Sequence, residues 1–101
     1  MDDPVIGAGS AAVPTDRPVE VLVRYFAAAR AAAGVTEERL TLPDPATVRL
    51  ALTEAERRHG AMLATVLQRC SFLVDEIAVH GRDTVLTDGA VLDVLPPFAG
   101  G

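Results

Sequence analysis

The stretch VEVLVRYFAAARAAAG, residues 19–34, decides the fold of this chain. Alternating apolar residues predict a β-strand over Val19–Phe26, with a buried face formed by Val19, Val21, Val23 and Tyr25. The alanine run that follows, Ala27–Ala33, predicts a short helix, and Gly34 is the residue type that ends such a helix. A strand therefore leads directly into a helix at the start of the folded domain.

The second face of this strand carries Glu20, Leu22, Arg24 and Phe26. Two charged side chains on one face indicate contact with solvent, and Phe26 is a large aromatic residue at the end of that face. We therefore expect Phe26 to be exposed.

A second strand and a longer helix follow. Leucines alternate with polar residues over 38–42, before Pro43. The helix is predicted from four apolar residues at i, i+3, i+4 and i+7, which are Val48, Ala51, Leu52 and Ala55. Asp44 and Thr47 are both residue types that cap a helix, so the sequence allows two start positions for this helix, three residues apart.

The remaining elements complete an α+β order. The long helix ends at Gly60 and carries an outward Glu54–Arg58 pair, and residues 61–68 predict another apolar helix. Further strands are predicted at residues 72–74, 77–79 and 91–95. This order predicts a mixed sheet with helix packed on one face.

The composition limits what the chain can do. It has 101 residues, enough for one small domain, and 9 basic against 14 acidic residues give a net charge of −5. This acidic balance opposes binding to nucleic acid phosphates. No apolar stretch approaches the roughly 20 residues that cross a bilayer, so we expect no membrane partner. A single cysteine excludes a disulfide within the chain and favours the cytoplasm.

Three segments are predicted along the chain. Residues 1–18 contain prolines and glycines without apolar periodicity, which predicts a disordered leader, and they lack the pattern of a signal peptide. Residues 19–95 form the domain. Residues 96–101 form an extended C-terminal tail ending in Gly-Gly.

The domain itself offers few groups for catalysis. His59 and His80 lack the spacing of metal ligands, so we expect no metal site. We expect His59 to be a cation at the end of a helix and His80 to lie in a surface loop. Cys70 is expected to behave as a small buried hydrophobic residue; a catalytic nucleophile is the alternative, but no base is identifiable nearby. The neighbouring carboxylates of Asp75 and Glu76 fit a turn.

The end of the chain, from the last residue of the domain onward, offers a different chemistry. It reads Leu95-Pro96-Pro97-Phe98-Ala99-Gly100-Gly101. The two prolines donate no backbone N–H, so they end the last strand and hold the chain extended, while glycine fits a channel too narrow for side chains. The Gly101 carboxylate is then the candidate reactive group, and another protein must activate it. A frayed terminus is the alternative.

From Val19 to Gly101 the chain resembles the MoaD and ThiS sulfur carriers, which are ubiquitin-like β-grasp proteins, and most closely the molybdopterin synthase branch. The resemblance rests on residues 24–30, 46–48, 86–89 and the terminal motif 95–101. Three departures from the family pattern are Asp75, where the family often has Asn, Ala90, where an acidic residue commonly follows Asp-Gly, and the extra leader before Pro18.

The resemblance implies a sulfur cycle at Gly101. An adenylating enzyme of the MoeB type uses ATP to activate its carboxylate, and a sulfurtransferase system converts it to a thiocarboxylate, a 1-thioglycine. The chain itself binds no cofactor. The tail, through Pro96, Pro97, Phe98, Ala99 and Gly100, inserts into the large subunit of molybdopterin synthase, a heterotetramer. There the thiocarboxylate donates its sulfur to cyclic pyranopterin monophosphate, a step of molybdenum cofactor biosynthesis. The resemblance implies that the catalytic side chains belong to the large subunit and that this chain supplies none.

The last strand predicts the docking surface. If Leu92 and Val94 face the helix, then Val91, Asp93 and Leu95 face outward, on the same kind of exposed sheet surface as Phe26. Phe26 and Leu95 are therefore the expected anchors of a partner interface that includes Val91. Scattered surface residues without a partner are the alternative.

Three other functions remain open. The tail would equally serve a sulfur carrier for thiamine, cysteine or tRNA thiolation. It would also serve a ubiquitin-like modifier conjugated to lysines, or belong to an interaction domain whose tail is inert.

Overall fold

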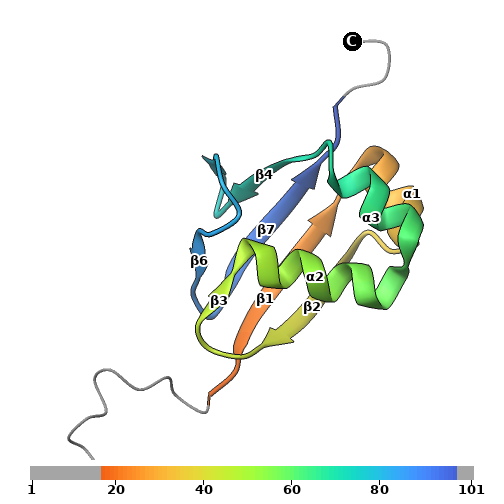
Figure 1. The fold of residues 1–101 in the computed structure, drawn as a ribbon. Helices are drawn as coiled ribbons and strands as arrows, with labels where there is room; N and C mark the ends of the chain where they lie inside the picture. The colour runs from red at the N-terminus through yellow and green to blue at the C-terminus, as the bar shows by residue number, and fades with distance from the viewer. Residues whose placement is uncertain (1–16, 98–101) are drawn as a thin grey trace, which may run out of the picture.

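The computed structural model describes residues 17–97, and the predicted leader up to residue 16 and the tail from residue 98 onward lie outside them. The described chain folds around a five-stranded sheet in the order β2-β1-β7-β4-β5 (Figure 1). Its strands are β1 (Val19–Tyr25), β2 (Glu37–Leu42), β4 (Ser71–Val74), β5 (Ile77–Val79) and β7 (Ala90–Leu95). All five match the predicted strands to within one residue.

The first and last strands form the centre of the sheet. β1 runs parallel to β7, with Val21 opposite Ala90 and Tyr25 opposite Val94. The other neighbours, β1–β2, β7–β4 and β4–β5, are antiparallel. The sheet is therefore mixed, as predicted, and the two central strands end at the same side of it (Figure 1).

Three helices cover one face of the sheet. They are α1 (Ala27–Ala33), α2 (Val48–His59) and α3 (Ala61–Leu67). α2 crosses in front of the sheet in Figure 1, and α1 and α3 lie together toward the end where the central strands finish. The order of elements confirms the α+β prediction. None of the helices in residues 17–97 has the length and hydropathy of a membrane span.

Local signals explain where the helices begin and end. Thr47 caps α2, because its Oγ1 accepts a hydrogen bond from the backbone N–H of Leu50 at 3.2 Å. This resolves the start that the sequence left open. Gly34 ends α1 with a φ of +80°, in the left-handed region that glycine adopts without strain.

The core is built from aliphatic side chains and alanines. Ala29 and Ala51 are fully buried, so the helix backbones approach their neighbours closely. The largest fully buried aliphatic side chains come from both layers and are Leu40, Leu52, Leu63, Leu67, Leu86, Leu92, Val21, Val23, Val48 and Val94. The buried face predicted for β1 is confirmed, with all four residues at most 6% exposed.

A small second sheet was not predicted. β3 (Ala46–Thr47) pairs antiparallel with β6 (Val85–Leu86), which joins the start of α2 to the segment before β7. Strands of two residues are too short to show an alternating pattern, so the sequence carries no signal for them.

Asp75 and Glu76 form the predicted turn between β4 and β5, and both have positive φ, +50° and +71°. The backbone N–H of Asp75 donates to the carbonyl of Val91, and Asp75 Oδ1 accepts from the N–H of Val91, each at 2.9 Å. A carboxylate oxygen here accepts as an asparagine oxygen would. The departure from the family pattern at Asp75 is therefore compatible with the turn.

Candidate functional site

The candidate site is the root of the C-terminal tail, which we define as Leu95, Pro96 and Pro97. Because β1 and β7 are parallel, their last residues lie side by side, with Tyr25 opposite Val94. The backbone N–H of Phe26 donates to the carbonyl of Val94 at 3.3 Å. Phe26 is thus held next to β7, the strand that leads into the tail root.

The junction of β1 and α1 presents Phe26. Ala27 has a φ of +51°, so the chain turns sharply after the strand. Phe26 is the N-cap residue of α1, and its carbonyl accepts from the N–H groups of Ala29 and Arg30. Phe26 is 39% exposed, as predicted. The backbone therefore fixes an exposed aromatic residue beside the tail root.

The other two predicted anchors lie on the sheet face opposite the helices, which we call the open face. Leu92 and Val94 are buried toward the helices, so Val91 and Leu95 point to the open face, as expected. Both are half-buried. The register places Leu22 opposite Val91, so an apolar strip crosses the two central strands. A docking role for this strip stays a prediction.

An ion pair that the sequence did not reveal lies at the centre of the open face. Arg24 Nε is 2.6 Å from Asp93 Oδ1, and its NH2 group is 2.9 Å from Oδ2. Asp93 was expected to be exposed, but it is only 4% exposed under the guanidinium. The hydrogen bonds to Asp93 raise the pKa of Arg24 further above its usual value. The open face thus carries apolar residues on its two central strands, and the two charged side chains between them, Arg24 and Asp93, neutralise each other.

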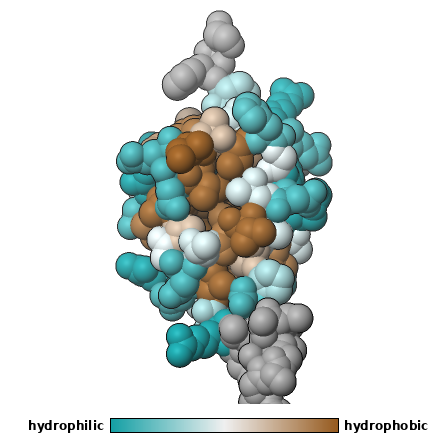
Figure 2. Space-filling view, turned by 90° about the vertical axis from the view of Figure 1, so that its left-hand side faces the viewer, coloured by the Kyte–Doolittle hydropathy of each residue, from teal (hydrophilic) through white to brown (hydrophobic). Residues whose placement is uncertain are grey.

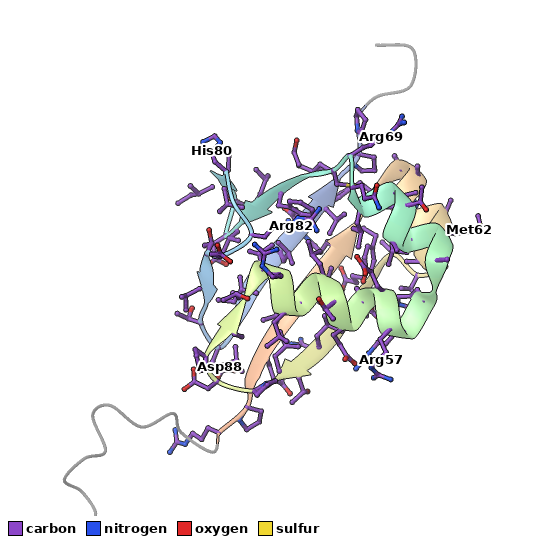
Figure 3. All side chains as sticks on the ribbon, in the orientation of Figure 1. Arg57, Met62, Arg69, His80, Arg82 and Asp88 are labelled. Carbon is purple, nitrogen blue, oxygen red and sulfur yellow. The ribbon has the colours of Figure 1, made fainter. Side chains whose placement is uncertain are left out.

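A groove that the sequence did not predict lies between α1 and α3, on the helical side of the tail root. Its volume is about 270 Å³, and its walls come from Ala28, Thr65, Val66, Arg69, Pro96 and Pro97. Figure 3 shows Arg69 at the end of the molecule where the tail leaves. The groove could not be read from periodicity, because three separate segments form it.

His59 forms part of an internal polar cluster. It is the last residue of α2, as predicted, but its Nε2 lies 2.7 Å from Glu38 Oε2 and it is not simply a helix-end cation. Tyr25 donates its hydroxyl hydrogen to the same oxygen at 2.5 Å. Burial, and then the hydrogen bond to Glu38, raises the pKa of Tyr25. These groups hold β1, β2 and α2 together, which is a structural role.

The remaining candidate groups offer no catalytic arrangement. His80 is exposed in the segment between β5 and β6, as predicted. Cys70 is half-buried, and its Sγ donates to the carbonyl of Val66 at 3.3 Å. Burial raises the pKa of this thiol, which favours the unreactive protonated form. Among residues 17–97, no three His, Cys, Asp or Glu side chains converge as metal ligands.

Exposed aliphatic residues also occur away from the tail. Ile77 in β5 is 70% exposed and Val85 in β6 is 60% exposed. Figure 2 shows hydrophobic surface on the side of the molecule that these two strands border. Exposure alone therefore does not identify a docking surface. The tail root is distinguished because the exposed residue Phe26 lies next to the strand that leads into the C-terminal tail.

Comparison with known proteins identifies the family of the chain. The model of the ThiS family matches residues 23–101. The molybdopterin synthase sulfur carrier subunit of Chlamydomonas reinhardtii is 33% identical over 84 residues, which cover 82% of this chain and 100% of that protein.

Solved structures give the same family and fold. A protein from Pyrococcus furiosus assigned as molybdopterin converting factor subunit 1 is 33% identical, with a TM-score of 0.67 over 79% of this chain and 99% of that one. The complex of subunits 1 and 2 of molybdopterin-converting factor from Helicobacter pylori contains a chain that is 26% identical, with a TM-score of 0.55 over 82% of this chain and 100% of that one.

SAMP1 from Haloferax volcanii has a TM-score of 0.73 at 24% identity, covering 81% of this chain and 99% of that one. At this identity the likeness concerns the fold alone. Together, these structures confirm the ubiquitin-like β-grasp fold.

Proposed function

The chain belongs to the ThiS/MoaD family, and from this membership we propose that it is the sulfur carrier subunit of a molybdopterin synthase. One structural observation carries the proposal. The tail root continues β7, a central strand, directly into two prolines, and the exposed residue Phe26 is held to the end of β7 by the hydrogen bond from its backbone N–H to the carbonyl of Val94. This geometry suits a domain that presents its own C-terminus to another protein.

The chemistry is assigned to Gly101, which lies outside the described residues. In the first step, the Gly101 carboxylate attacks the α-phosphate of ATP in an adenylating enzyme of the MoeB type, and pyrophosphate leaves. A persulfide of the sulfurtransferase then displaces AMP from the acyl adenylate to form an acyl disulfide, and a thiol reductant cleaves the S–S bond to leave the thiocarboxylate on Gly101. ATP and the sulfur source belong to the partners.

In the last step, the thiocarboxylate sulfur is transferred to cyclic pyranopterin monophosphate in the large subunit. The sulfur attacks a carbon of the precursor and displaces an oxygen substituent, which forms a thioester with Gly101. Hydrolysis of the acyl C–S bond of this thioester leaves the sulfur on the product and returns the Gly101 carboxylate for another cycle. Two loaded carriers supply the two sulfurs of a dithiolene, which fits a heterotetramer. The scarcity of reactive groups in residues 17–97 supports a carrier whose catalytic side chains lie in its partner.

The open face and Phe26 supply the docking surface. Phe26, Leu95 and Val91 offer apolar contacts next to the tail, and aromatic anchors commonly dominate the energy of such interfaces. The paired charges of Arg24 and Asp93 reduce the cost of covering this face with another protein.

The molybdopterin branch is favoured over the other functions by two observations. The Chlamydomonas reinhardtii relative carries that name at 33% identity, and the Helicobacter pylori structure pairs subunit 1 with subunit 2. Carriers for thiamine, cysteine or tRNA thiolation and lysine-conjugated modifiers share the fold and remain the alternatives.

The first experiment tests loading. Protein with its native C-terminus is incubated with an adenylating enzyme, ATP and a sulfurtransferase, and its intact mass is measured. A gain of one oxygen-to-sulfur exchange is expected, and deletion of Gly101 should abolish it. A wild-type mass that never changes would support an inert interaction domain instead.

The second experiment tests the acceptor. Loaded protein is mixed with cyclic pyranopterin monophosphate and a large subunit, and the dithiolene product is assayed. A loaded protein that yields no dithiolene would rule out the molybdopterin assignment and leave the other sulfur carriers.

A further inference from the structure

We propose that the groove between α1 and α3 is a second contact site for the large subunit, and that it receives an apolar side chain flanked by a carboxylate. This inference rests on the proposed function, since it concerns the protein that receives the tail. It adds a surface on the helical side of the tail root, away from the open face that holds Leu95 and Val91.

The lining of the groove selects an apolar group. Alanine and proline side chains supply no hydrogen-bonding groups, and Pro96 and Pro97 also lack a backbone N–H. The hydroxyl of Thr65 already donates to the carbonyl of Ala61 at 3.1 Å. Apart from the guanidinium of Arg69, the side chains of the walls therefore offer no free hydrogen-bonding group to an inserted group, which favours an aliphatic or aromatic side chain. The volume of about 270 Å³ has room for one such side chain.

The charge of the groove selects a carboxylate. Arg69 is exposed, and within residues 17–97 it makes no ion pair or side-chain hydrogen bond. Arg24, Arg49, Arg57 and Arg58 all bind carboxylates of the domain. Arg30 and Arg39 make no ion pair within residues 17–97 either, but Arg69 is the arginine that lines the groove. An unpaired guanidinium beside an apolar groove is complementary to a carboxylate next to an apolar side chain.

The position of the groove identifies its occupant. Pro96 and Pro97 are both a wall of the groove and the first residues of the tail. From Pro96 to Gly101 the chain spans at most about 20 Å when fully extended. A protein that holds Gly101 in its active site therefore comes within reach of the groove. Contacts in the groove and on the open face would fix the tail root from two sides.

The apolar part is tested with Ala28→Gln, which places a polar side chain in the groove. Ala31→Gln is the matched control, because Ala31 is exposed on the same helix but does not line the groove. The dissociation constant for the large subunit is measured by calorimetry. We expect Ala28→Gln to weaken binding by about 10-fold or more and Ala31→Gln to change it by less than about 2-fold.

The charged part is tested with Arg69→Gln, with Gln68→Glu as its control. Both substitutions lower the net charge by one, but Gln68 does not line the groove. Arg69→Gln should weaken binding by about 3- to 10-fold at low salt and make it less salt-dependent than in the wild type. Gln68→Glu should keep the salt dependence of the wild type.

The outcomes separate this inference from the proposed function. If the wild type binds and yields dithiolene while Ala28→Gln and Arg69→Gln bind like their controls, the groove is not a contact site and the proposed function stands. If the wild type does not bind the large subunit, the proposed partner is wrong and the large subunit is not the occupant of the groove. Circular dichroism of each variant confirms that it is folded.

Discussion

Arg24 and Asp93 lie directly opposite each other on the two parallel central strands and form a two-contact ion pair on the open face. The side chain of Asp93 is 6% exposed and that of Arg24 is 37% exposed, so the carboxylate depends on the guanidinium more than the reverse. A buried carboxylate without its counter-charge is strongly destabilising.

Loss of the cation should therefore destabilise the fold more than loss of both charges. Arg24→Met leaves the Asp93 carboxylate buried and unpaired, and we expect the midpoint of thermal unfolding to fall by about 10 °C or more. The double variant Arg24→Met/Asp93→Leu should recover much of this loss. Thermal unfolding followed by circular dichroism measures both, and equal midpoints would contradict the asymmetry.

Tyr25 should resist ionisation in the folded protein. Burial and the hydrogen bond to Glu38 raise its pKa above the ordinary value of 10.0, so the folded state holds the phenolic proton more tightly than the unfolded state. The resulting stability is fully present below pH 10 and is lost as the pH rises toward the folded pKa.

The sequence makes this titration simple to follow. Tyr25 is the one tyrosine and there is no tryptophan, so tyrosinate absorbance reports this residue alone. Little tyrosinate should form at pH 10 while the protein is folded. Tyr25→Phe should remove the loss of stability above pH 10, and it should cost about 1–2 kcal/mol at neutral pH by removing a hydrogen bond to a carboxylate. A native midpoint near pH 10 would contradict the proposed burial effect.

Glu54 should stay ionised in strong acid. The hydrogen bond from Arg57, and then that from Arg58, lowers its pKa from 4.5 to about 2. Its stabilising contribution is therefore present above pH 4.5 and lost as the pH falls through about 2. Carboxyl-carbon chemical shifts measured by NMR should place its titration there. Arg57→Gln should raise this pKa, whereas Arg49→Gln, at the other end of α2, should leave it unchanged.

Replacing Glu76 with glycine should relieve backbone strain in the turn and stabilise the fold. The φ of Glu76, +71°, is unfavourable for an L-residue and free for glycine. After subtracting the larger entropy of glycine in the unfolded chain, we expect Glu76→Gly to stabilise the protein by about 0.5 kcal/mol. Urea unfolding measures the change. Glu37→Gly, in the extended backbone of β2, should instead destabilise it.

The docking anchors should matter for binding more than for stability. Phe26→Ala and Leu95→Ala should each weaken binding to the large subunit by about 10-fold or more, because anchor residues dominate interface energies. Phe26→Ala should change stability little, since Phe26 is 39% exposed. Val85→Ala is the control, an exposed apolar residue in β6 that is not part of the tail root. If both anchor variants bind the large subunit as tightly as the wild type, the open face is not part of the interface.

Local patterns in the sequence predicted most of the fold. β1, α1 and α2 follow from alternation, an alanine run and helical spacing, because each pattern reports contacts of residues near one another in the chain. The exact start of α2 required the hydrogen bond between Thr47 and Leu50, which sequence alone could not choose over Asp44.

Features made by distant residues were not predictable in the same way. Asp93 is buried because Arg24, 69 positions away, covers it in a register that no local pattern encodes. The groove combines Ala28, Thr65 and Pro96 from three segments. Phe26 was found because its exposure follows from its place at the end of one strand, whereas the reactive end of the chain was inferred from the chemistry of glycine and proline.

The central position of β7 has a mechanical consequence. A partner that pulls on the tail pulls along β7, whose two long edges are hydrogen-bonded to β1 and β4. Such a load shears both ladders at once, and their bonds share the force instead of opening one after another. The domain should therefore remain folded while its C-terminus is repeatedly inserted into a partner and withdrawn from it.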